Sequence, residues 1–133
     1  MTGDYILDAS ALLAILLGEP GQERVIEILD RCFIHNVNVA EVIARLIRSG
    51  VPPSAAQSAI EELQLPIEFE FRLAAECAEL LVARRDLGLS LGDCVCLATA
   101  AESGATAVTA DRLRARVHGS KLRGKPLLVE VIR

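Results

Sequence analysis

Short apolar runs alternate with longer stretches of helical periodicity along the chain. Apolar runs at residues 5–7, 32–34 and 105–109, and a β-rich run at 127–132, each predict a strand. Residues 67–71 alternate strictly between apolar and acidic side chains, which is typical of an edge strand with one wet and one dry face. The chain therefore carries about five strand candidates.

Helical spacing and helix-ending glycines divide the remainder. A Ser-x-x-Gln pattern from Ser54 to Gln57 predicts a capping box at the start of one helix. Gly50, Gly88 and Gly104 are expected to end three others. The helices predicted are residues 9–17, 22–30, 39–49, 54–65, 73–87 and 90–103, with a short basic helix at 112–118.

This alternation, without repeats or linkers, predicts a three-layer α/β/α domain with about five mostly parallel strands. We expect residues 1–133 to form one domain. Asp8 interrupts the apolar stretch 6–17 and no basic residue precedes it, so a secretory signal is not expected. Since no other apolar stretch approaches about twenty residues, we expect a soluble, cytoplasmic protein without membrane association.

Composition adds the nature of the core. With 52% hydrophobic and 3% aromatic residues, the core is expected to consist of Leu, Val, Ile and Ala, and disorder is excluded. The cysteines and histidines show no paired spacing, so neither a zinc site nor a disulfide framework is expected. We expect the cysteines to be buried, reduced thiols instead. These residues are Cys32, Cys77, Cys94 and Cys96, with His35 and His118.

The net charge of −4 combines two regions of opposite sign. Residues 1–111 carry 7 basic and 17 acidic residues, whereas residues 112–133 carry 7 basic residues and 1 acidic residue. An acidic protein binds nucleic acid poorly, but a basic segment beside an acidic site would change that expectation.

Four acids, Asp8, Glu41, Asp93 and Asp111, stand where a strand passes into a helix or where a helix begins. Each has a local explanation. Asp8, or Ser10 in its place, could cap the helix that follows the first strand, and Asp111 could cap the helix that begins at Arg112. Glu41 lies three residues after Asn38, and Asp93 three after Ser90, so either could be the second acid of a capping box.

The set of four has a second interpretation. In a doubly wound sheet these positions share the crevice outside the carboxyl ends of the strands. Four carboxylates there repel one another, and Mg²⁺ or Mn²⁺, which prefer hard oxygen ligands, would relieve that repulsion. The chemistry indicated is phosphodiester hydrolysis by metal-activated water. Ser10 and Thr109 add hydroxyls that could orient a carboxylate or a water, or simply bond within turns.

Four sequence blocks surround these acids in a fixed order. They are Tyr5-Ile6-Leu7-Asp8-Ala9-Ser10-Ala11, Asn38-Val39-Ala40-Glu41-Val42, Leu89-Ser90-Leu91-Gly92-Asp93 with Leu97-Ala98, and Val108-Thr109-Ala110-Asp111-Arg112. Together they resemble a PIN domain, and most of all the VapC-type ribonuclease toxins of toxin–antitoxin pairs. The resemblance covers nearly the whole chain, including residues 129–133.

The resemblance implies strand order 3-2-1-4-5, a Mg²⁺ or Mn²⁺ site made by the four acids, and endoribonuclease activity. It also implies a homodimer and a small antitoxin partner that blocks the site. Two positions depart from the family pattern: His35 replaces a small hydroxyl residue, and Cys94 replaces Ala. Both bear on substrate preference more than on activity.

The basic segment directly after Asp111 could hold the RNA backbone beside the metal, or could be a solvated face. Its residues are Arg112, Arg114, Arg116, Lys121, Arg123 and Lys125. Because aromatic residues are few, we expect recognition through RNA shape and backbone contacts rather than base stacking.

Two other functions compete with the ribonuclease toxin. A catalytically inactive PIN-fold module that binds protein or RNA would not need all four acids. A phosphotransfer protein fits poorly, because a phosphatase of the haloacid-dehalogenase type would carry a second Asp at Ser10. A receiver domain would carry its phosphorylated Asp where Phe71 stands.

Overall fold

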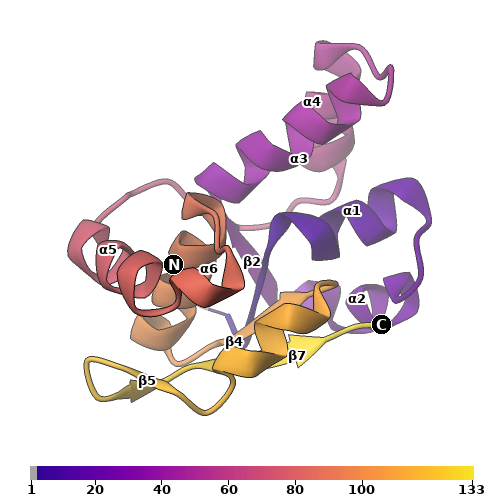
Figure 1. Cartoon of the computed structure of the whole chain (residues 1–133). Helices are drawn as coiled ribbons and strands as arrows, with labels where there is room; N and C mark the ends of the chain where they lie inside the picture. The colour runs from indigo at the N-terminus through magenta and orange to yellow at the C-terminus, as the bar shows by residue number, and fades with distance from the viewer. Residues whose placement is uncertain (1–2) are drawn as a thin grey trace.

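A parallel five-stranded sheet forms the centre of the protein (Figure 1) in a computed structural model that describes residues 3–133. Its order is β3-β2-β1-β4-β7, and every neighbouring pair is parallel. The order 3-2-1-4-5 is confirmed, with β7 as the fifth strand of the sheet. The strands are β1 (Tyr5–Leu7), β2 (Cys32–His35), β3 (Ile67–Glu68), β4 (Thr106–Thr109) and β7 (Leu128–Val131).

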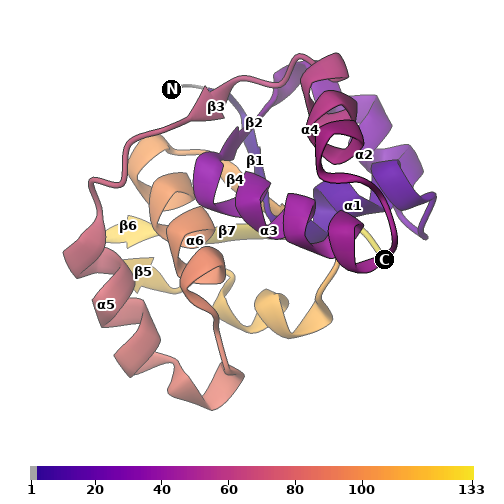
Figure 2. The same ribbon diagram turned by 90° about the horizontal axis from the view of Figure 1, so that it is seen from above.

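Helices cover both faces of the sheet, as Figure 2 shows. Alternate residues of β1 point to opposite faces, so Ile6 packs beneath α5 and α6 while Leu7 packs beneath α1 to α4. The three-layer α/β/α arrangement is thereby confirmed. The helices are α1 (Ala9–Leu17), α2 (Gln22–Ile28), α3 (Asn36–Arg48), α4 (Pro53–Glu62), α5 (Ala74–Ala83) and α6 (Leu91–Ser103), with 3₁₀ turns η1 (Leu29–Arg31), η2 (Arg85–Leu87) and η3 (Arg112–Val117).

Two predicted helix starts are wrong. Helix α3 begins at Asn36, three residues before the predicted residue 39, because His35 caps it and its Nδ1 atom accepts from the Val37 amide at 3.0 Å. The capping box at Ser54 is absent: α4 begins at Pro53, whose missing amide hydrogen costs nothing at that position.

The edge strand is shorter than its pattern predicted. β3 pairs with β2 only over Ile67 and Glu68, and the chain then leaves the sheet, so Phe69 and Phe71 are 69% and 44% exposed. The apolar side chains of residues 67–71 therefore do not form a buried face along the whole segment. The position of β3 at the edge of the sheet is confirmed.

Three smaller features also differ from the sequence-based expectations. The helix predicted for 73–87 ends at Ala83 and is followed by the separate turn η2, and the basic helix at 112–118 is the 3₁₀ helix η3. A hairpin of β5 (Lys121–Leu122) and β6 (Lys125–Pro126) was not predicted. Its turn places Arg123 and Gly124 at positive φ, where Arg gives no turn signal. Among residues 3–133, no helix is both long and apolar enough to cross a membrane.

Candidate metal-binding and catalytic site

All four predicted acids line one open cleft of about 270 Å³ at the carboxyl ends of β1 and β4. The first turns of α1 and α6 and the face of α3 from Glu41 to Arg48 contribute to the same cleft, so residues spread over a hundred positions of sequence meet there. Polar and charged neighbours complete it. The polar and charged lining consists of Asp8, Ser10, Glu41, Arg45, Arg48, Asp93, Asp111 and Arg114.

Asp8 is the most buried of the four acids, with 8% of its surface exposed. It caps α1, and its Oδ1 atom accepts from the Ala11 amide at 2.9 Å and from the Ser10 hydroxyl at 2.7 Å. Burial raises the pKa of the Asp8 carboxyl above its ordinary value, hydrogen bonds from Thr109 and Ser10 oppose the shift, and the charge of Asp93 adds to it. Added positive charge would therefore be favourable beside Asp8.

Ser10 and Thr109 join the loops that follow β1 and β4. Their hydroxyl oxygens lie 3.3 Å apart. The Ser10 hydroxyl accepts from the Ala110 amide at 2.8 Å, and the Thr109 hydroxyl accepts from the Asp111 amide at 3.1 Å. Both hydroxyls thus hold the backbone that carries Asp8 and Asp111.

Glu41 is held by Asn38, one turn earlier on α3. The Nδ2 atom of Asn38 donates to Glu41 Oε1 at 2.8 Å and to the carbonyl oxygen of Gly92 at 3.1 Å. The helix-cap explanation of Glu41 is wrong, since Asn38 lies inside α3 and His35 is the cap. Asn38 and Gly92 both belong to the sequence blocks that surround the acids, but neither was predicted to have a role at the site.

Gly92 leaves the space that Glu41 occupies. A Cβ atom at position 92 would overlap the Glu41 carboxylate. The buried Oδ1 atom of Asn38 has no hydrogen-bond partner within the described part of the chain. An unpaired buried oxygen beside a carboxylate suits a bound water or the hydration shell of an ion.

Arg114 of η3 lies between the other two acids. Its Nη2 atom is 2.7 Å from Asp93 Oδ2 and 3.3 Å from Asp111 Oδ2. Its side chain is only 13% exposed, and its Nε atom is buried without a partner among residues 3–133. A guanidinium of the protein itself thus pairs with two of the four carboxylates.

Asp93 and Asp111 also make the local bonds expected of helix caps. Ser90 and Asp93 form the predicted capping box, with distances of 2.8 Å and 3.1 Å. Asp111 accepts from the Leu113 amide at 2.9 Å. Each of these carboxylates has a second oxygen, so the cap bonds leave acceptor capacity in the cleft.

The donor set fits a hard divalent cation, because carboxylate oxygens are the ligands that Mg²⁺ and Mn²⁺ prefer. In residues 3–133, however, no three His, Cys, Asp or Glu side chains converge closely enough to hold one ion as they stand. Glu41 is turned towards Asn38, and Asp93 towards Arg114. Rotation of these side chains is needed for joint coordination.

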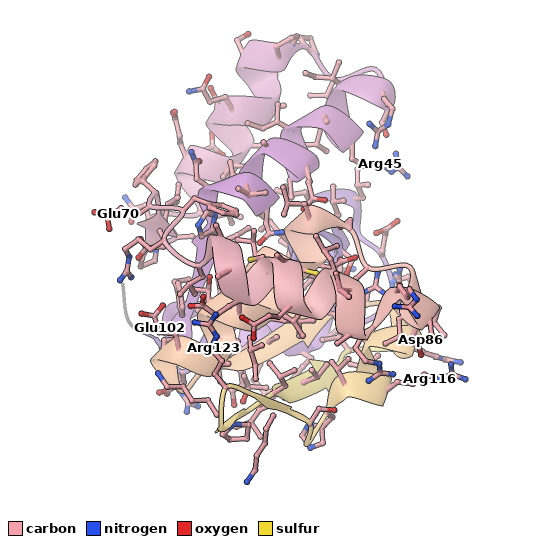
Figure 3. The ribbon with its side chains drawn as sticks, turned by 60° about the vertical axis from the view of Figure 1, so that its left-hand side comes forward. Arg45, Glu70, Asp86, Glu102, Arg116 and Arg123 are labelled. Atoms are coloured by element: carbon pink, nitrogen blue, oxygen red, sulfur yellow. The ribbon has the colours of Figure 1, made fainter. Side chains whose placement is uncertain are left out.

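The basic segment predicted to contact RNA does not lie on one surface. Arg114 is its only member in the cleft. Arg112 donates to the Arg133 carbonyl oxygen, and Arg123 pairs with Glu76 and Glu79 of α5. Figure 3 shows Arg116 far from Arg123, and Arg45 far from both. Lys121 and Lys125 are exposed on the hairpin.

Arg45 and Arg48 also line the cleft, although they were not among the predicted site residues. Their spacing from Glu41 could have indicated this position. They follow Glu41 by four and seven residues, which places all three side chains on one face of a helix.

The two departures from the family pattern have structural roles. His35 caps α3 through Nδ1 and donates from Nε2 to the Glu70 carbonyl oxygen at 2.9 Å. Cys94 is fully buried, and this burial raises the pKa of its thiol to about 11. All four cysteines are free and buried, as expected.

The comparisons with known proteins agree with this fold. Residues 5–119 match the PIN domain, so the chain belongs to the PIN domain family, whose members are generally nucleases. No curated protein sequence matches the chain.

Two solved structures share the fold. The first is PAE2754 from Pyrobaculum aerophilum, with 23% identity, a TM-score of 0.62, and coverage of 87% of this chain and 86% of that chain. The second is VapBC2 from Rickettsia felis bound to a DNA fragment from their promoter. There the identity is 17% and the TM-score 0.66, over 97% of this chain and 98% of that chain.

Proposed function

We propose that this protein is a divalent-metal-dependent endoribonuclease and the toxin of a type II toxin–antitoxin system. The observation that carries the proposal is the meeting of Asp8, Glu41, Asp93 and Asp111 in one cleft. The family contributes the nuclease class. The likeness to VapBC2 supports a small antitoxin protein as partner, and we extend the proposal to a homodimer of this chain.

Asp8 and Asp93 would hold Mg²⁺ or Mn²⁺, with Glu41 and Asp111 completing the acidic cleft. When bound, such an ion supplies positive charge at the scissile phosphate and lowers the pKa of the attacking water. Ser10 keeps the Asp8 carboxylate in place through its 2.7 Å hydrogen bond. Glu41, kept over Gly92 by Asn38, would take up a proton at its Oε2 atom.

RNA cleavage by purified protein tests the proposal. Asp8→Asn and Asp93→Asn should each abolish cleavage of a mixed RNA substrate in Mn²⁺ and should abolish growth inhibition on induced expression. Asp30→Asn, an exposed change of the same charge outside the cleft, is the matched control and should cleave normally. Cleavage at the wild-type rate by either Asn variant would sink the proposal, as would harmless expression without new RNA ends.

A PIN-fold binding module without activity is the second candidate. The ion pairs of Arg114 with Asp93 and Asp111 favour it, because they fill part of the acidic site with the protein's own cation. Such a module would bind RNA or protein but leave RNA intact in Mn²⁺. We further propose that residues 1–133 act as one domain in the cytoplasm.

A further inference from the structure

Helix α3 carries three charged side chains in a row along the cleft. Glu41, Arg45 and Arg48 occupy positions i, i+4 and i+7, and all three line the cleft. The opposite face of the same helix is buried in the core through Val39, Val42 and Leu46. The core contacts therefore fix which face of α3 is presented to the cleft.

The two arginines are exposed, and neither forms an ion pair with any acid among residues 3–133. Arg45 donates a hydrogen bond to the Ser49 hydroxyl, one turn further along. Several arginines elsewhere are paired, including Arg24 with Glu130 and Arg31 with Asp4. The guanidinium groups of Arg45 and Arg48 are thus available to an anion.

We propose that Arg45 and Arg48 bind the backbone phosphates of single-stranded RNA beside the scissile bond. This inference rests on the ribonuclease function proposed above. Along the helix axis, Arg45 and Arg48 lie about 6 Å and about 10.5 Å from Glu41, at 1.5 Å per residue. The strand then runs along α3 away from the carboxylates, with guanidinium forks on its phosphate oxygens.

The C-terminal basic segment is the alternative RNA contact, and its placement argues against it. Arg123 is already paired with Glu76 and Glu79. Lys121 and Lys125 lie on the hairpin, outside the cleft lining. A structural explanation of Arg45 and Arg48 also exists, because cations near a helix C-terminus stabilise it. That explanation predicts no effect on RNA binding.

Fluorescence anisotropy with a labelled single-stranded RNA of mixed sequence distinguishes these explanations. EDTA prevents metal-dependent cleavage, so binding is read alone. Arg45→Gln with Arg48→Gln should weaken binding about tenfold at low salt and reduce the salt slope by about 0.7 for each phosphate that is no longer neutralised. The matched control, Lys121→Gln with Lys125→Gln, removes the same charge and should bind within about twofold of wild type.

Unchanged binding by the arginine variant, or equal weakening by the lysine variant, would overturn the inference. Arg45→Lys with Arg48→Lys keeps the charge and should retain most of the affinity. If the double Gln variant fails to fold, Arg48→Gln alone takes its place, since the exposed Arg48 side chain makes no hydrogen bond or ion pair with residues 3–133. Cleavage by the wild-type protein in Mn²⁺ is measured in parallel. If wild type cleaves RNA and the arginine variants bind RNA as tightly as wild type, only this inference is rejected. If wild type neither cleaves nor binds RNA, both proposals are rejected.

Discussion

Arg114 shows how a single residue can hold an acidic site together. The guanidinium lies within 3.3 Å of two carboxylates, so the protein supplies its own positive charge. Its place in the basic segment that begins directly after Asp111 suggested contact with RNA. The pair of Arg114 with Asp111 is local, at i and i+3, but sequence could not reveal the contact with Asp93, because it joins residues 21 positions apart whose approach only the packed fold determines.

Arg114→Gln should lower the stability of the protein without metal and increase its stabilisation by Mn²⁺. Loss of the ion pairs leaves the carboxylates uncompensated, at a cost of about 1.5–3 kcal/mol for hydrogen bonds to charged groups. Urea unfolding in EDTA and in Mn²⁺ measures both effects. Arg116→Gln is the control of equal charge and should change neither. An Arg114 variant as stable as wild type in EDTA would show that the ion pairs do not contribute to the free energy of unfolding.

At the scale of elements, the site depends on how closely α3 approaches the first turn of α6. Asn38 spans the two helices, and Gly92 allows Glu41 to lie against the α6 backbone. The capping box at Ser90 and Asp93 was predictable because it depends on local spacing alone. The contact of Glu41 with Gly92 was not, since it joins residues 51 positions apart whose approach only the packed fold determines.

Gly92→Ala should separate activity from stability. Ala is favoured over Gly inside a helix by up to about 1 kcal/mol, so unfolding should be unchanged or slightly harder. The added Cβ must displace the Glu41 carboxylate, so RNA cleavage should fall about tenfold or more.

A double variant supplies the control. In a Glu41→Gln background the Gly92→Ala change should cost little further cleavage, because the displaced carboxylate is already gone. Full additivity of the two effects would mean that Gly92 acts through something other than Glu41.

Over the whole molecule, the alternation of strands and helices was enough to predict the layers, and the family resemblance supplied the strand order. The apolar runs at β1, β2 and β4 are unambiguous because both faces of a central parallel strand are buried. The edge strand was less predictable. Residues 67–71 have the alternation of a strand, yet pairing with β2 ends at Glu68, and the Glu70 carbonyl oxygen accepts a hydrogen bond from the His35 side chain instead.

Both core layers contain buried cysteines, and burial lowers the reactivity of their thiols. Burial raises the pKa of the Cys77 thiol from 9.0 to about 11 and that of Cys32 to about 12. The unfolded chain therefore binds fewer thiol protons than the folded one above about pH 9, and stability should fall as pH rises through this range. Urea unfolding at pH 8 and pH 10 under reducing conditions measures the decrease.

A Cys77→Ala with Cys32→Ala variant should lose less stability between these two pH values than wild type. At pH 8, the thiols of the native protein should react with a disulfide reagent only as fast as it unfolds. Rapid labelling of one thiol in the native state would contradict the burial that the fold assigns to it.

The strand order has a consequence for the time at which the site forms. β1 lies at the centre, so the chain emerging from the ribosome first builds β2 and β3 outward on one side. That half carries only Asp8 and Glu41. Asp93 and Asp111 flank β4, which pairs with β1 across about a hundred residues. The nascent chain can therefore assemble no complete acidic cleft until β4 has docked, and synthesis halted before that point releases a chain without the assembled site.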